Sequence, residues 1–362
     1  MKLTLQVQIL PDAKQAKTLL ETMGRFNEAA NFAAQVGFEA GVFSQPSIHE
    51  RCYKEIRGRF GLSSQMAVRA IGKVVEVFAG DKSVCPEFRP RGAVTYDQRI
   101  LSFKGLDKVS LWTMTGRMLL PIVYGEYQGE RFDRLKGQVD LVYRDGRFFL
   151  YATIETPEGA PIKIGGFLGV DLGIVDIATD SDGGNHSGAD IETVRRRHLK
   201  NRRRYQRKKS KGAREALQRQ RRRGSLFRRH QNHCISKHLV ETAKGTGRGI
   251  AMEDLHGIRE RTTVRAKDRA RHSGWAFLQL RTFVEYKAEL AGVPVVLVDP
   301  RNTSRTCNAC GHCEAGNRKT RDDFVCKHCG HSAPADLNAA RNHKDRAWGT
   351  SKGPPGLASL RA

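Results

Sequence analysis

Cysteine spacing near the C-terminus carries the clearest chemical signal in this chain. Cys307 and Cys310 form one CxxC pair, and Cys326 and Cys329 form a second pair after a gap of 15 residues. Each pair directs two thiolates toward one ion, and four thiolates complete a tetrahedral zinc site without an open position. With no secretory signal at the N-terminus, this clustering favours a metal site over disulfides. We therefore predict a structural zinc ribbon over residues 307–333.

Other potential zinc ligands lie beside these cysteines. Cys313 follows Cys310 by three residues, so two neighbouring pairings are open in the first half of the site. Three histidines of the same segment also carry ring nitrogens that bind zinc, namely His312, His328 and His331. The two CxxC pairs are the preferred ligand set, and the role of Cys313 stays open.

Three acidic residues occupy positions at which α/β sheets form sites. Asp171 ends the apolar strand expected over Phe167–Val170, and Glu253 ends the strand expected over Ile250–Met252. Ligand sites of open α/β sheets lie outside the carboxyl ends of the strands. Asp336 opens the last expected helix, and it joins the other two acids if that helix packs across the sheet. These three carboxylates are the candidate catalytic residues and metal ligands.

Clustered carboxylates repel one another, so they need cations to remain ionised together. Hard oxygen ligands select Mg²⁺ or Mn²⁺, and two such ions clamp the attacking and leaving oxygens of a phosphodiester. Taken singly, each acid also has an ordinary structural explanation. Asp171 fits a tight turn, Glu253 an exposed strand end and Asp336 a helix N-cap.

Positive charge is concentrated in the second half of the chain. The 362 residues carry a net charge of +25, of which +21 lies in residues 161–362. The densest block, Arg195–Arg229, holds 18 basic residues and one acid, Glu215. Such a block repels itself, and nucleic-acid phosphates would neutralise it, whereas a solvated basic face is the alternative. The candidate nucleic-acid contacts are Arg195, Arg196, Arg197, Arg202, Arg203, Arg204, Arg207, Lys208, Lys209, Arg221, Arg222 and Arg223.

Hydrophobic patterning outlines the elements of the first half. Residues 2–10 alternate as a half-buried strand, Ala13–Phe43 has helical periodicity, and residues 45–80 are expected to form further helices. Later residues alternate again, and Asp145-Gly146 marks a hairpin turn. The pattern predicts a β-barrel or sheet with a helical insertion, followed by a linker at Thr156–Pro161.

The second half has the pattern of an α/β layer domain. Strands are expected over Phe167–Val170, Ile174–Ala178, Gly249–Met252 and Val293–Val298. Helices are expected over residues 190–243 with breaks near Ser210 and Gly224, over Trp275–Ala291 and over Ala335–His343. Residues 349–362 are expected to form a disordered tail. Apolar runs fall far short of the roughly 20 residues of a membrane helix, so we expect a cytoplasmic protein without membrane contact.

The same motifs resemble a known family. Gly169–Ile174 resembles the first RuvC motif, Ile250–Leu255 the second, and Ala335–Asn342, after the cysteines, the third. Asp299–Cys307 resembles the segment that leads into the zinc ribbon of TnpB proteins. The basic helices between the first two motifs belong to the same pattern. The resemblance extends over nearly the whole chain and is most specific over residues 165–345.

Resemblance to TnpB proteins implies an RNA-guided DNA endonuclease encoded by an insertion-sequence transposon. It implies a guide RNA transcribed from the element's end, a short target-adjacent motif, and cutting of double-stranded DNA at one RuvC site. It assigns Asp171, Glu253 and Asp336 to two magnesium or manganese ions, and the four CxxC cysteines to zinc.

The resemblance also implies a domain plan and leaves rival functions to weigh. The plan is an α+β, multidomain fold. It has a wedge-like β-barrel over 1–10 and 84–160, a helical recognition insert over 11–83, and a C-terminal RuvC-like (ribonuclease H-like α/β) nuclease domain over 161–306 and 334–348. Rival readings are a compact type V CRISPR effector, a nuclease-inactive RNA-guided repressor, a DNA transposase, and a sugar-kinase or actin-like ATPase. The intact set of acids disfavours the repressor, the motif order disfavours the transposase, and the basic block with the cysteine cluster disfavours the ATPase.

Overall fold

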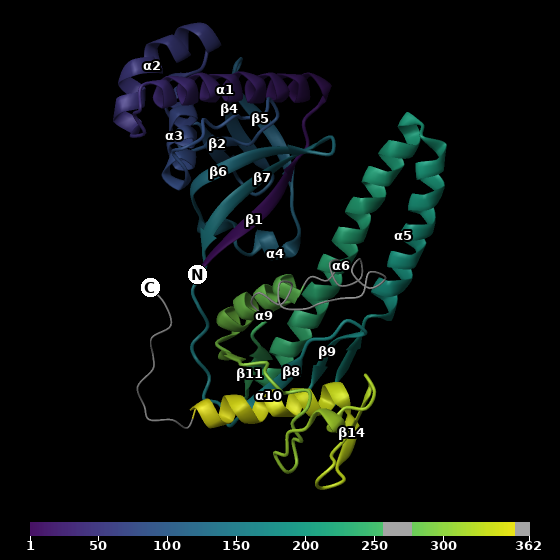
Figure 1. The fold of residues 1–362 in the computed structure, drawn as a ribbon. Coiled ribbons are helices and arrows are strands. Elements are labelled where there is room, and N and C mark those ends of the chain that lie inside the picture. Colours follow the sequence, from purple (N-terminus) through teal and green to yellow (C-terminus); the bar gives the residue numbers. More distant parts are fainter. Residues whose placement is uncertain (256–276, 352–362) are drawn as a thin grey trace. The chain divides into compact units, whose positions relative to one another are not determined.

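The computed structural model describes residues 1–255 and 277–351, and the chain divides into two compact units (Figure 1). The first unit is Met1–Pro157 and the second is Glu158–Ala362. The division falls inside the segment Thr156–Pro161 that we expected to be a linker. Each unit has its own hydrophobic core. Within the described ranges, no helix combines the length and apolar character needed to cross a membrane.

An antiparallel sheet of seven strands, in the order β2-β6-β7-β1-β5-β4-β3, forms the frame of the first unit. Its strands are β1 (Lys2–Ile9), β2 (Val94–Tyr96), β3 (Leu101–Lys104), β4 (Lys108–Thr113), β5 (Gly116–Val123), β6 (Leu135–Arg144) and β7 (Arg147–Glu155). The alternation of β1 buries Leu5, Val7 and Ile9, as its sequence predicted. The hydroxyl of Tyr96 in β2 donates to the carbonyl of Trp112 in β4 at 3.0 Å. This bond links opposite halves of a nearly closed sheet.

The predicted hairpin turn is confirmed between β6 and β7. Asp145 has φ 52° and Gly146 has φ 78°. Positive φ at both central positions is the requirement of the two-residue turn that matches the twist of the paired strands.

Three helices are inserted between β1 and β2. They are α1 (Ala13–Glu39), α2 (Gln45–Phe60) and α3 (Ser64–Gly80), and a short α4 (Glu126–Gly129) follows β5. Asp12 and Gln15 form a capping box at the start of α1, and Ser44 and Ser63 cap the next two helices. The first helix ends four residues before the predicted Phe43, because the chain turns at Gly41 with φ 63°.

A five-stranded sheet in the order β10-β9-β8-β11-β12 forms the frame of the second unit. Its strands are β8 (Phe167–Asp171), β9 (Asp176–Asp180), β10 (Asn185–Ser187), β11 (Gly249–Glu253) and β12 (Val295–Val298). The strands β8, β11 and β12 are parallel, whereas β9 is antiparallel to β8. The predicted strand Ile174–Ala178 is shifted by two residues, because Ile174 and Val175 belong to the turn, where the Val175 carbonyl accepts from the Gly188 amide.

The helices of the second unit are α5 (Ala189–Lys208), α6 (Lys211–Gly245), α9 (Phe277–Ala291) and α10 (Ala335–Ser351). Ser210 caps α6 and accounts for the predicted break there. The predicted break at Gly224 is wrong, since α6 runs through it without interruption. A Cβ at Gly224 would lie 2.9 Å from the His198 ring of α5. The absence of a side chain at this position therefore lets α5 and α6 pack closely.

The start of α9 and the end of α10 differ from the helix bounds that the sequence predicted. Trp275, the predicted start of α9, lies outside the described residues, and α9 is described from Phe277. The helix α10 continues to Ser351, past the predicted start of a disordered tail at residue 349. Its final turns are packed, because Ala347 is buried and Trp348 contacts Phe167 edge to face. The remainder of that predicted tail, residues 352–362, lies outside the described ranges.

The helix α10 lies directly against β8, and Gly169 permits this contact. A Cβ on Gly169 would lie 1.9 Å from the Ala340 carbonyl oxygen and 2.7 Å from the Lys344 amide nitrogen. Real Cβ atoms do not approach backbone atoms so closely, so only glycine fits here. The missing side chain brings the two backbones together and fixes where residues of α10 stand over the sheet.

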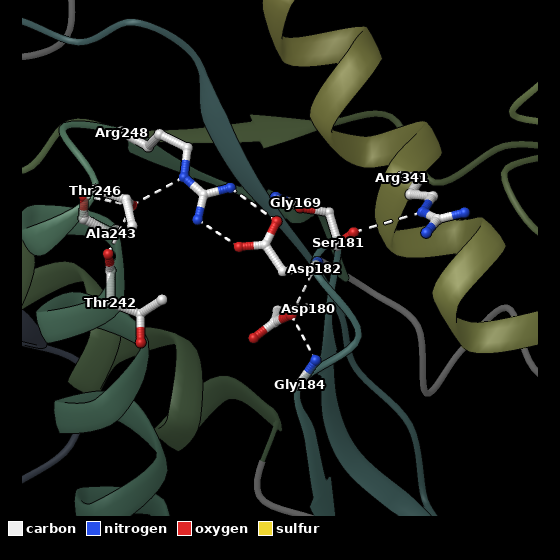
Figure 2. A network of polar contacts seen from close by, with 10 residues as sticks. All are labelled: Gly169, Asp180, Ser181, Asp182, Gly184, Thr242, Ala243, Thr246, Arg248 and Arg341. Carbon is white, nitrogen blue, oxygen red and sulfur yellow. Dashed lines mark hydrogen bonds and ion pairs between the residues drawn. The ribbon is translucent and has the colours of Figure 1, made fainter.

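A polar network lies beside the N-terminal ends of β8 and β11, as Figure 2 shows. Arg248, just before β11, donates to Asp182 at 2.9 Å and to Thr246 at 2.9 Å. Asp180 accepts from the amides of Asp182 and Gly184, which shapes the turn between β9 and β10. The network therefore ties the end of α6 to this turn and sets where β11 begins.

We predict that Gly169→Ala destabilises the protein by about 3 kcal/mol, because the backbone of α10 or β8 must move to admit the methyl group. The matched control is Gly166→Ala, where nothing lies within 4 Å of the added Cβ, so a change below about 1 kcal/mol is expected. Urea unfolding of both variants measures the difference. Equal stability of the two variants would contradict the assigned close contact.

Candidate functional site

Two of the predicted acids meet at the carboxyl ends of neighbouring parallel strands. Asp171 ends β8 and Glu253 ends β11, and the register pairs Val170 with Met252 just before them. One carboxylate oxygen of each lies within 4.8 Å of the other and of a ring nitrogen of His343. The strand topology therefore brings together residues that are 82 positions apart in the sequence.

Asp336 stands beside this pair but outside the closest group. It lies in the first turn of α10, and a carboxylate oxygen is 3.4 Å from the Arg318 guanidinium. Burial and the Asp171 carboxylate raise the pKa of Asp336, while Arg318 acts in the opposite direction. The three predicted acids thus share one region, with Asp336 held by an arginine of the cysteine-bearing segment.

The electrostatics of the site are those of buried carboxylates that repel one another. Burial and the adjacent Asp171 carboxylate raise the pKa of Glu253 to about 8. The backbone N–H of Leu172 favours the ionised form of Glu253, and Asp336 adds further repulsion. Without a cation, the cluster therefore retains a proton near neutral pH. Its oxygen-rich donor set suits a hard divalent ion such as Mg²⁺ or Mn²⁺.

His343 is the residue that sequence reasoning missed. It lies seven residues after Asp336, which is about two turns of helix, so both side chains project from the same side of α10. Its ring is fully buried, and Nε2 lies 3.3 Å from Asp171 Oδ1. The seven-residue spacing from Asp336 was a usable signal, but a lone histidine within a helix does not by itself indicate a site.

The four CxxC cysteines form a compact cluster. The sulfur atoms of Cys307, Cys310, Cys326 and Cys329 all lie within 4.8 Å of one another. The amides of Gly311 and Gly330 donate to the carbonyls of Cys307 and Cys326, which closes a tight turn at each pair. Positive φ values of 76° and 73° explain why glycine occupies both positions.

Cys313 lies outside that cluster. It is exposed, and its backbone pairs with Thr306 in an isolated bridge. The second pair is carried by a short hairpin, β13 (Asp323–Val325) with β14 (Ser332–Pro334), which leads directly into α10. The donor set is therefore four sulfurs from two hairpin-like turns, which is the set that a tetrahedral zinc ion takes.

Eleven of the predicted nucleic-acid contacts lie on α5 and α6, Lys209 lies between the two helices, and most of these side chains are exposed. Two of the twelve, Arg195 and Arg222, are only half-exposed. Arg195 and Arg196 pair with Glu192 at 2.6 and 2.9 Å. A groove of about 790 Å³ runs between the helices and is lined in part by Arg202, Arg221 and Arg228. The basic residues thus form a surface along a helical hairpin.

Comparison with known proteins finds a matching domain family and several relatives. Residues 277–343 match the family described as Cas12f1-like, TNB domain. The CRISPR-associated endodeoxyribonuclease Cas12f1 of Sulfoacidibacillus thermotolerans is 40% identical over 117 residues, which is 32% of this chain and 26% of that protein. The TnpB-like protein MJ0751 of Methanocaldococcus jannaschii is 42% identical over 80 residues, 22% of this chain and 29% of that protein.

A longer match is found with the putative RNA-guided DNA endonuclease InsQ of Escherichia coli K12. It is 26% identical over 305 residues, covering 77% of this chain and 72% of that protein. The chain covers only 26% and 21% of the length of two Cas12f1 relatives.

A solved structure shares the fold of most of the chain. The cryo-EM structure of a Cas12f1–sgRNA–target DNA complex matches with a TM-score of 0.65 at 14% identity, over 92% of this chain and 83% of that chain. The mixed α/β, multidomain character predicted from the sequence is confirmed by this match. Together with the order of the acidic and cysteine motifs, these similarities support the predicted resemblance of the chain to TnpB-family proteins.

Proposed function

We propose that this protein is an RNA-guided DNA endonuclease of an insertion-sequence element, cutting double-stranded DNA beside a short target-adjacent motif. The observation that carries the proposal is the meeting of Asp171 and Glu253 at the ends of β8 and β11, with Asp336 beside them. A cluster of carboxylates at this edge of a sheet is the donor set of a metal-dependent phosphodiesterase.

Asp171, Glu253 and Asp336 would hold the divalent ions. When bound, two ions supply an activated water and stabilise the departing 3′ oxygen of the phosphodiester. Asp171 and Glu253 are the last residues of β8 and β11, so paired strand backbone fixes the positions from which their carboxylates project. Asp336 contributes a third from the first turn of α10, and its present partner Arg318 neutralises part of the negative charge.

Guide RNA and target DNA are the proposed partners. Base pairing would supply sequence specificity, while the protein binds the duplex through its backbone. The exposed arginines and lysines of α5 and α6 supply cations for those phosphates. Arginine outnumbers lysine there by 14 to 4 over Arg195–Arg229, which suits bidentate phosphate contacts.

A transposon context is favoured over a CRISPR effector. The match to InsQ covers 77% of this chain, whereas the match to Cas12f1 of Sulfoacidibacillus thermotolerans covers 32%. A nuclease-inactive repressor is disfavoured, because such a protein has no need to retain the buried repulsion between Asp171 and Glu253.

Replacing Asp171 by Ala tests the activity directly. The variant should lower guided plasmid cleavage by more than about 100-fold, because several kcal/mol of charge stabilisation are lost. Its affinity for guide RNA should be unchanged. Asp345→Ala, at an exposed position of the same helix as Asp336, is the matched control and should cleave normally. Cleavage by Asp171→Ala near the wild-type rate would rule out the proposed role.

The cysteine cluster is proposed to hold one structural zinc. Changing Cys326 and Cys329 together to Ser should lower the bound zinc from one per chain to none, because two of four thiolates are removed. The matched control is Cys313→Ser, which changes an exposed cysteine outside the cluster and should keep its zinc. Elemental analysis of purified protein gives both values, and a reversed pattern would reassign the ligands.

Glu253→Gln should stabilise the magnesium-free protein at alkaline pH. The folded-state pKa of Glu253 is about 8 against an ordinary 4.5, so the folded state holds the proton more tightly. The cost of ionisation is absent below pH 4.5, grows toward pH 8 and is then complete. The variant removes this cost, so its gain of about 1–3 kcal/mol at pH 9 should fade toward pH 5. Urea unfolding without added magnesium, with zinc left in place, measures it. A variant less stable than wild type at both pH values would contradict this origin of the strain.

A further inference from the structure

His343 stands closer to the two strand-end acids than its sequence position suggests. It lies on α10, is 0% exposed, and its Nε2 is 3.3 Å from Asp171 Oδ1. With Asp171 and Glu253 it forms the only group of three side chains in the described ranges, apart from the cysteines, whose ligand atoms approach within 4.8 Å. No part of the proposed function uses this ring.

The second ring nitrogen indicates the hydrogen-bonding role of the first. His343 Nδ1 is buried and has no hydrogen-bond partner within the described residues. If Nδ1 carried the proton, a buried donor would lack an acceptor and the Nε2 lone pair would face a carboxylate oxygen. With the proton on Nε2, the ring donates to Asp171. Only the Nδ1 lone pair then lacks a partner, and an unpaired acceptor costs less than an unpaired donor. The surroundings therefore favour Nε2–H as a donor to Asp171 Oδ1.

The ring is held in place by the anchoring of α10. Gly169 brings the helix backbone against β8 beside Ala340 and Lys344. The neighbouring Asn342 donates to the carbonyls of Thr303 and Thr306 at 2.8 and 2.7 Å. With the helix fixed on both sides, the imidazole has a defined position relative to the carboxylate that ends β8.

We propose that His343 is a positioning residue that orients the Asp171 carboxylate for a divalent ion through its Nε2–H. This rests on the proposed function, in which Asp171 holds the metal. A donor to one carboxylate oxygen fixes the rotation of the group, so the other oxygen is presented without a further loss of side-chain freedom. Partners of this kind are worth 10–100-fold in metal affinity at other sites, by order of magnitude.

Manganese binding to the full-length protein, followed by the electron paramagnetic resonance signal of free Mn²⁺, tests the proposal without requiring cleavage. His343→Gln keeps an N–H near the position of Nε2, whereas His343→Leu removes it at similar volume. His343→Asn keeps polarity near Nδ1 but does not reach Asp171. Asp171→Ala defines the binding that depends on the acidic site, and His49→Leu, at a half-buried histidine of the first unit, is the matched control.

The expected result is a loss of about 10–100-fold in Asp171-dependent Mn²⁺ affinity for the Leu and Asn variants, with Gln within about threefold of wild type. Thermal unfolding without added manganese should show all three variants folded. A folded Leu or Asn variant with wild-type affinity would overturn the proposal, as would a folded Gln variant as weak as Leu, which would make the ring itself a ligand. If wild type shows no Asp171-dependent binding at all, the proposed function fails first, so the two failures are distinguishable.

Discussion

The contact between α10 and β8 at Gly169 is the constraint on which the rest of the second unit depends. The strand contributes Asp171, and the helix contributes Asp336 and His343. These three residues can share a region only if the two backbones touch, and they touch because Gly169 has no side chain. The cysteine hairpin leads straight into α10, so the same contact also sets where the cysteine cluster stands relative to the acids.

A site of this kind is built at a cost to the metal-free fold. The high pKa of Glu253 reflects first its burial and then the repulsion by Asp171 at the sheet edge. Arg318 offsets part of the repulsion at Asp336, and the cysteine cluster likewise brings four sulfurs within 4.8 Å of one another. Both clusters are arrangements that a positive ion stabilises and that an empty site does not. The strain lies where the proposed chemistry requires charge, and the polar network around Arg248 holds the opposite end of the sheet without strain of that kind.

Local signals in the sequence predicted much of the fold. The alternation of β1, the Asp145-Gly146 turn, the helix break near Ser210 and the strand ends at Asp171 and Glu253 depend on neighbours within a few residues. Two of the errors arose where a distant contact overrides local preference. Gly224 looked like a helix break, but it is the point at which α6 makes room for His198 of α5. The last helix was expected to end at His343, but α10 continues to Ser351, and Trp348 packs on Phe167 of β8.

The sequence by itself determined the chemistry of this protein: which residues carry thiolates and carboxylates, and the spacing that makes each CxxC pair a tight turn. That information is local, because four residues suffice to close a turn around one ion. Only the tertiary structure decided which residues meet. In the folded chain His343 contacts Asp171, Arg318 pairs with Asp336, and Cys313 lies outside the sulfur cluster. Those contacts depend on how a helix and a sheet pack. Packing depends on the shapes of whole faces, which many side chains far apart in the sequence build together, so no short motif predicts it.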